Sequence, residues 1–234
     1  MQPITPIAGT VCLPGHDAPC NEQPIRQPNL ESWALSLLDR LPQNQPLNLC
    51  GWSLGGMVAL KAASLAPQRI QRVAVIGSGI VFARQGAFLE GAGPEAMSEF
   101  EAGCADPARL LKRFLALATW GMGRTEGKAI GGQVLPQPGD NMPTPDVLRA
   151  GLEILQNADL TPVASKIRAP VLVIHGMRDR VCHPELGKAL AGVLARTTEV
   201  SFTLHGQAGH APHWSHPGWV AETLRSFQLA SGVD

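Results

Sequence analysis

Residues 47–56, with the sequence LNLCGWSLGG, decide the fold of this chain. The first four residues form a short, mostly apolar run typical of a buried strand, and the helical pattern of Leu54–Leu65 follows at once. Between strand and helix lies a Gly-x-Ser-x-Gly motif centred on Ser53. In this context the motif predicts a nucleophile elbow, a sharp turn that lifts a serine hydroxyl above the edge of a sheet. The alternative is a glycine-rich turn with an incidental serine.

Steric crowding explains why glycines flank the serine of the motif. The turn places Ser53 in strained backbone geometry, and the residues two before and two after it, Gly51 and Gly55, are expected to crowd against neighbouring elements. Side chains at those two positions should therefore be minimal. The same turn directs the N–H of Leu54, at the start of the helix, toward the space above Ser53, where it can stabilise an oxyanion.

A serine nucleophile needs a base that is held by an acid. Two later apolar runs, residues 171–174 and 200–204, are followed by loops that contain Asp179 and His210. The chain order serine, acid, histidine is that of a nucleophile-elbow enzyme, and the carboxyl ends of parallel strands carry such groups. We therefore predict Ser53, Asp179 and His210 as a catalytic triad. The alternatives are a loop aspartate paired with a neighbouring arginine and one exposed histidine among several.

Alternating strands and helices predict an α/β fold. The strand candidates are rich in Val, Ile and Leu without strict alternation, which suits a mostly parallel sheet covered by helices on both faces. The predicted strands are residues 7–13, 47–50, 73–76, 171–174 and 200–204. The predicted helices that accompany them are residues 30–41, 54–65, 184–194 and 219–229.

The middle of the chain contains helical patterns but no clear strand. Residues 107–120 and 146–155 are predicted helices, and the proline-rich residues 135–145 are a predicted loop. A helical block between two halves of a parallel sheet usually lies over the edge where ligands bind. We therefore expect a core of residues 1–81 and 160–234 and a helical cap, or lid, of residues 82–159.

Composition narrows the class of protein. Of the 234 residues, 44% are hydrophobic and 16% charged, which favours a packed globule. Lys and Arg number 19, as do Asp and Glu, and a nucleic-acid-binding protein would usually carry a basic excess. No apolar stretch is long enough to span a membrane, and no signal peptide is recognisable. Five cysteines without a C-x-x-C pattern argue against structural zinc or a disulfide framework, so a cytoplasmic location is expected.

Two other motifs could indicate a metal site or a dinucleotide-binding loop, and neither is adopted. The histidines and cysteine of the C-terminal third match metal-ligand spacing only loosely, so neither a metal nor an organic cofactor is expected. The sequence Gly77-Ser78-Gly79 hints at a dinucleotide-binding loop, but Phe82 stands where a third glycine is required. The residues considered for metal binding are His175, Cys182, His183, His210, His213 and His216.

The chain resembles the α/β-hydrolases. Within them it is similar to the biotin-synthesis carboxylesterases, which remove the methyl group from pimeloyl-acyl-carrier-protein methyl ester. The resemblance covers nearly the whole chain from Leu13 onward. It rests on GWSLGG at residues 51–56, RFLAL at 113–117, GLEIL at 151–155, HAP at 210–212 and SHP at 215–217.

The resemblance implies a serine esterase acting on a carrier-bound methyl ester, with Ser53 as nucleophile, His210 as general base and Asp179 as its orienter. It implies that Trp52 and Phe114 contact the substrate, although Phe114 alternatively fills the core of the cap. An acidic acyl-carrier protein would dock on basic residues of the cap, and the enzyme would be a monomer. Ordinary solvated helix faces are the alternative for these basic residues, which are Arg109, Arg113, Arg124 and Lys128.

One departure from the family pattern concerns the N-terminal region. The loop at residues 13–17, LPGHD, resembles a family loop that ends in glycine, and Asp17 replaces that glycine. The strands and the His-Gly loop that normally come earlier are expected to be missing, which would remove one oxyanion donor. Two other functions therefore stay open: a general short-chain carboxylesterase of the same fold, or a shortened, non-catalytic hydrolase-like protein.

Overall fold

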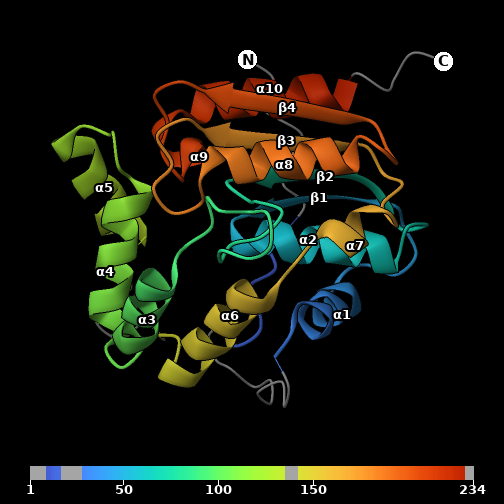
Figure 1. Ribbon diagram of the computed structural model, residues 1–234. Helices are drawn as coiled ribbons and strands as arrows, with labels where there is room; N and C mark the ends of the chain where they lie inside the picture. The colour runs from blue at the N-terminus through green and yellow to red at the C-terminus, as the bar shows by residue number, and fades with distance from the viewer. Residues whose placement is uncertain (1–8, 17–27, 135–141, 230–234) are drawn as a thin grey trace.

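The computed structural model describes residues 9–16, 28–134 and 142–229 (Figure 1). A four-stranded parallel sheet with the order β1-β2-β3-β4 lies at its centre. Because each strand pairs in parallel with the next one in sequence, all four carboxyl ends lie along one edge of the sheet. The strands are β1 (Leu47–Trp52), β2 (Ile70–Ile76), β3 (Val171–Gly176) and β4 (Val200–His205).

Strand burial follows position in the sheet. β3 is buried at every residue, whereas the edge strands β1 and β4 alternate between more and less exposed side chains. The central pair is in register from Val73 opposite Val171 to Ile76 opposite Ile174. The four predicted strands that correspond to β1–β4 are confirmed, each somewhat longer than expected.

The first predicted strand, residues 7–13, is wrong over its described part. Residues 9–13 form no strand, and a turn follows in which the N–H of His16 donates to the carbonyl of Leu13 at 3.0 Å. The carbonyl of Cys12 accepts from the guanidinium of Arg40 at 3.0 Å, so a side chain satisfies it. Gly15, at φ +78°, leaves no room for a Cβ beside Val147. This segment therefore contacts the helices that carry Arg40 and Val147, and its Leu13 packs against the larger core.

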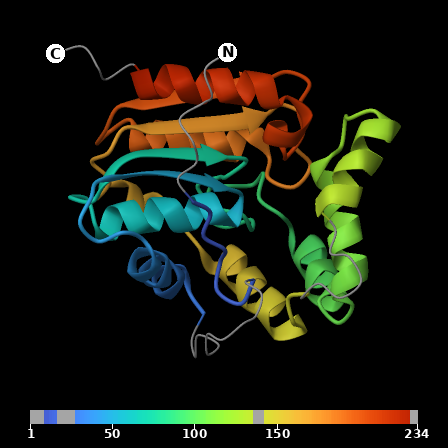
Figure 2. The ribbon, with the colours of Figure 1, turned by 180° about the vertical axis from the view of Figure 1, so that it is seen from behind.

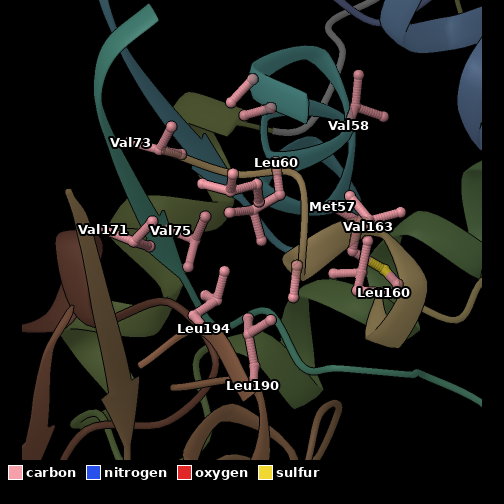
Figure 3. Packing of buried hydrophobic residues seen from close by; sticks show 14 of the residues in the cluster. Met57, Val58, Leu60, Val73, Val75, Leu160, Val163, Val171, Leu190 and Leu194 are labelled. Atoms are coloured by element: carbon pink, nitrogen blue, oxygen red, sulfur yellow. The ribbon is translucent and has the colours of Figure 1, made fainter. Parts of the chain in front are cut away.

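Helices cover both faces of the sheet (Figure 2). One face packs against α2 and α8, with α1 outside α2, while α10 packs on the other face against Ala74, Ile76, Leu172 and Ile174. The larger core joins Leu60 of α2 and Leu194 of α8 to valines of β2 and β3 (Figure 3). These helices are α1 (Leu30–Arg40), α2 (Leu54–Leu65), α7 (Thr161–Ala164), α8 (Pro184–Leu194), α9 (Pro212–Ser215) and α10 (Pro217–Leu229).

A helical segment separates β2 from β3. Its helices α3, α4 and α5 stand beside the edge at which the strands end (Figure 1). The two ends of the segment meet, because Val81 and Asp159 form an isolated antiparallel bridge and Leu160 N–H donates to the Ile80 carbonyl at 2.9 Å. The helices are α3 (Pro94–Gly103), α4 (Pro107–Ala118), α5 (Arg124–Val134) and α6 (Pro145–Asn157).

The predicted helices at residues 107–120 and 146–155 correspond to α4 and α6 and are confirmed. Most of the predicted loop at 135–145 lies outside the described residues. Among the helices that the structure describes, none combines the length and the apolar character needed to cross a bilayer.

Replacing Leu60 by alanine should lower the free energy of unfolding by about 2–5 kcal/mol, because this fully buried side chain would leave a cavity between α2 and the sheet. Urea unfolding measures the loss. The matched control is Leu65→Ala at the end of the same helix, where the side chain is 37% exposed and the loss should be about 1 kcal/mol or less. Equal losses in the two variants would contradict the packing described for α2.

Candidate active site

Ser53 lies between β1 and α2 with φ 53° and ψ −123°, and no other non-glycine residue in the described part of the chain has a positive φ. Such a conformation costs about 1–3 kcal/mol and must be held by its surroundings. The N–H of Ser53 donates to the carbonyl of Ile76 at 2.8 Å, and the hydroxyl of Ser78 donates to the carbonyl of Ser53 at 2.7 Å. The sharp, strained turn predicted at Ser53 is therefore present.

The glycines around Ser53 only partly follow the prediction. A Cβ on Gly51 would collide with the backbone of Gly55, as expected for close approach of β1 and α2. Gly55 itself has open space around its Cβ position, so the expectation of crowding there is wrong. The second crowded position is Gly56, where a Cβ would collide with the hydroxyl of Ser78. The space beside α2 is thus needed by the serine that holds the turn.

The start of α2 leaves the N–H of Leu54 without an acceptor inside the helix. The N–H groups of Gly56 and Met57 donate to the Ser53 carbonyl at 3.0 and 3.3 Å. Leu54 is the first residue of the helix, so its own N–H has no intrahelical acceptor and lies at the positive end of the helix dipole. This is the position expected of an oxyanion donor next to Ser53.

Asp179 and His210 come together from the loops that follow β3 and β4. Both are buried, and Oδ2 of Asp179 lies 2.8 Å from Nδ1 of His210. The other carboxylate oxygen, Oδ1, accepts the N–H groups of Val181 at 2.8 Å and Cys182 at 2.9 Å. Burial alone would raise the pKa of Asp179, but its contacts with His175 and His210 outweigh burial and hold the pKa well below its ordinary value. The carboxylate is therefore ionised at neutral pH.

The remaining ring nitrogen of His210, Nε2, is buried and has no hydrogen-bond partner within the part of the chain that the structure describes, so no hydrogen bond joins it to the Ser53 hydroxyl. The backbone of His210 is tied to the elbow, because its carbonyl accepts the indole N–H of Trp52 at 2.9 Å. On its other side lies Gly77, at φ +60°, where a Cβ would stand about 3 Å from Nδ1. His210 is thus fixed beside the residue that precedes Ser53, with Nε2 available to accept a proton.

An aromatic cluster surrounds Trp52. Its ring centroid lies 5.7 Å from that of Phe114, 5.4 Å from that of His210, 5.0 Å from that of His213 and 4.8 Å from that of Trp214. Phe114 also lies 6.0 Å from His210, edge to face. Phe114 comes from α4 and is only partly buried, so it stands at the candidate site and is not sealed inside the helical segment.

Sequence reasoning missed three residues of this site: His175, His213 and Trp214. His175 lies 3.1 Å from Asp179 Oδ2, and His213 and Trp214 complete the cluster on Trp52. Burial, and secondarily the charge of His210, lowers the pKa of His213 to about 4. The histidines were considered only as metal ligands, and no grouping of three metal-ligating side chains occurs among the described residues. The available signal was the closeness of His213 and Trp214 to His210 in the sequence.

The basic residues predicted on the cap do not form one uniform surface. Arg113 is paired with Glu99 of α3, and both side chains are more than half exposed. Arg109 and Lys128 are exposed on α4 and α5. Arg124 begins α5, but its side chain lies outside the described part of the structure. Part of the positive charge expected to meet a partner is therefore balanced within the chain.

A cavity of about 500 Å³ opens between α3, α4 and the loop that carries Asp179. Phe82, Phe100 and Leu117 give it an apolar lining, and its charged lining residues are of both signs: Arg113, Arg180, Glu90, Glu99 and Asp179. The guanidinium of Arg180 also stacks over the ring of Trp120 at 3.7 Å. A chain of methylene groups would suit the apolar part of this lining.

Comparisons with known proteins agree with this geometry. Residues 8–223 match the model of the alpha/beta hydrolase family. A pimeloyl-[acyl-carrier protein] methyl ester esterase of Photobacterium profundum is 32% identical over 220 residues, which cover 93% of this chain and 82% of that protein. The enzyme of the same name from Aromatoleum aromaticum is 32% identical over 216 residues, covering 89% of this chain and 82% of the relative.

The fold is shared with solved structures of low sequence identity. An esterase from Exiguobacterium antarcticum superimposes with a TM-score of 0.77 at 17% identity, covering 92% of this chain and 78% of the esterase. A family match over most of the chain, relatives of more than 30% identity and the strand–elbow–helix arrangement around Ser53 all point the same way. The chain belongs to the α/β-hydrolase family.

Proposed function

We propose that this chain is a serine carboxylesterase that hydrolyses the methyl ester of pimeloyl-[acyl-carrier protein]. One observation carries the proposed catalysis: a buried His210–Asp179 pair stands beside the strained Ser53 turn, with Nε2 of His210 unpartnered among the described residues. The substrate is proposed from the relatives of that name, which match about nine-tenths of this chain.

In the proposed chemistry each of these groups has one role. Nε2 of His210 takes the proton of the Ser53 hydroxyl as Oγ attacks the ester carbonyl, and Asp179 stabilises the imidazolium that forms. The Leu54 N–H donates to the developing oxyanion. His210 then returns the proton to the leaving methoxide, and methanol departs. A water molecule then attacks the acyl-enzyme while His210 takes one of its protons. His210 returns this proton to Oγ of Ser53, which regenerates the hydroxyl. The product acid leaves and loses its own proton to solvent, so it is released as a carboxylate.

The helical segment α3–α6 is proposed as a cap over this site. Phe114 of α4 reaches Trp52 and His210, and the cavity beside Asp179 has apolar walls suited to the methylene chain of an acyl group. The exposed Arg109 and Lys128 would attract an acidic carrier protein. Because Arg113 is paired with Glu99, we assign it a smaller share of that attraction.

Replacing Ser53 by alanine should lower ester hydrolysis by at least about 10⁴-fold, because no nucleophile would remain at the elbow. Hydrolysis of pimeloyl-acyl-carrier-protein methyl ester and of p-nitrophenyl butyrate measures the loss, and a fluorophosphonate probe reports acylation. Ser64→Ala, in the last turn of α2, is the matched control and should keep both properties. Wild-type protein that binds carrier protein but takes up no probe would support the non-catalytic alternative.

Replacing Asp179 by asparagine should lower kcat by about 10⁴-fold. The N–H groups of Val181 and Cys182 already occupy one carboxylate oxygen, so the amide oxygen would take that place and the NH₂ group would face His210. Nδ1 of His210 would then have to accept a hydrogen bond, which places the ring hydrogen on Nε2. In that tautomer His210 cannot take the proton of Ser53.

The control for this variant is Asp39→Asn, an exposed carboxylate at the end of α1, which should leave kcat within about twofold of wild type. Circular dichroism establishes that both proteins are folded. A rate for Asp179→Asn close to that of wild type would remove Asp179 from the proposed mechanism.

Reversing the charges of Arg109 and Lys128 together to glutamate should lower kcat/KM for the carrier-bound ester about tenfold at low salt, since these side chains are exposed and would repel an acidic partner. Hydrolysis of p-nitrophenyl butyrate should stay unchanged. The control for net charge is the double reversal of Lys166 and Arg196 to glutamate, two exposed residues outside the helical segment. Equal slowing of both substrates would instead favour the general short-chain esterase.

A further inference from the structure

His175 is a second histidine at Asp179, and it comes from the sheet itself. It lies near the end of β3, is fully buried, and has its ring against α8. A Cβ on Gly187 of that helix would collide with Nδ1 of His175, so the helix presents bare backbone to the ring. The catalytic scheme proposed above gives this histidine no role, although it contacts the same carboxylate oxygen as His210.

The contacts of His175 determine where its ring hydrogen lies. Nε2 is 2.9 Å from the carbonyl oxygen of Cys182 and 3.1 Å from Oδ2 of Asp179. Both neighbours are hydrogen-bond acceptors, so Nε2 must carry a hydrogen. Nδ1 is buried and has no partner among the described residues, and a hydrogen there would be an unsatisfied buried donor. The favoured form therefore has its single hydrogen on Nε2.

Four nitrogen atoms surround the Asp179 carboxylate. Oδ1 accepts two backbone N–H groups, from Val181 and Cys182, while Oδ2 faces Nδ1 of His210 and Nε2 of His175. A carboxylate offers about four such sites, and these four nitrogen atoms lie around it. The carbonyl of Cys182 is held by the same Nε2–H, which ties the loop that donates to Oδ1 back to β3. Orientation and charge of the carboxylate thus both depend on His175.

The other charged or titratable groups near this trio are few. Cys182 is buried, and burial followed by the charge of Asp179 raises the pKa of its thiol, so it stays neutral. His213 faces His210 from α9. Arg178 and Arg180, on the loop after β3, are exposed. Among the groups that touch the carboxylate directly, His175 is thus the competitor of His210 for its charge.

We infer that His175 is a positioning residue for the proposed hydrolase, which orients the Asp179 carboxylate through its Nε2–H and limits how strongly that carboxylate stabilises protonated His210. The inference rests on the proposed function. When His210 takes up the Ser53 proton, Asp179 stabilises the resulting charge. If His175 were replaced by a residue without a hydrogen-bond donor, Oδ2 would interact with His210 alone, and its charge would stabilise the His210 imidazolium more strongly.

Two substitutions of similar size separate these effects. His175→Gln places an amide N–H about where Nε2 lies, whereas His175→Met fills the space without a donor. The acidic limb of the kcat/KM profile for p-nitrophenyl butyrate should move up by about one pH unit in His175→Met, and kcat should fall about tenfold. His175→Gln should restore the wild-type profile. A merely structural histidine would lower stability in both variants and leave the acidic limb in place, which would overturn the inference.

Nuclear magnetic resonance gives a second measurement, which does not depend on turnover. In wild-type protein, the nitrogen shifts of the His175 ring should show the hydrogen on Nε2, and a hydrogen on Nδ1 would overturn the inference. In His175→Met, the resonance of the His210 Nδ1 hydrogen should shift downfield, and an unchanged resonance would overturn it as well. Failure of the proposed function is a separate outcome, recognised by wild-type protein that hydrolyses no ester and takes up no fluorophosphonate.

Discussion

A charged carboxylate buried beneath the carboxyl edge of the sheet is the constraint on which the site depends. Without partners, a buried ion of this kind would cost many kcal/mol, and it would take up a proton instead. Asp179 stays ionised because the loop after β3 supplies two backbone N–H groups and because two histidines face its other oxygen. Satisfying this one charge draws the loops after β3 and β4 together, and it fixes the position of the proposed general base.

The strained turn at Ser53 is the second element that the rest of the fold must support. Its cost is small relative to the packing of α2, most of whose residues are buried and which contacts β1, β2 and α1. The turn is also held from the neighbouring strand, since Ile76 and Ser78 contact the backbone of Ser53 and not its hydroxyl. The hydroxyl is thereby left for chemistry, and the strain is maintained by groups that take no part in the proposed reaction.

Patterns that are local in sequence predicted most of this architecture. Buried runs of Val, Ile and Leu mark β2 and β3, and the elbow and the order of Ser53, Asp179 and His210 follow from motif and strand ends. What could not be predicted depends on neighbours distant in sequence. Residues 9–13 resemble a strand, yet Arg40 of α1 satisfies a carbonyl there. Gly55 resembles a crowded glycine, yet Ser78 needs the space at Gly56. The proposed role of His175 depends on the positions of Cys182 and Asp179 around its ring, which only the folded structure gives.

Phe114 connects the helical segment to the proposed chemistry. Its ring lies against both Trp52, which precedes the nucleophile, and His210, the proposed base. Trp52 also donates its indole N–H to the His210 carbonyl. A change in the position of α4 would therefore shift Phe114 and Trp52, and through Trp52 the backbone of His210. Ring contacts of this kind are individually worth about 0.5–1.5 kcal/mol, which corresponds to roughly tenfold at most in a rate. A shift of α4 would therefore change the geometry of the proposed base without moving the sheet.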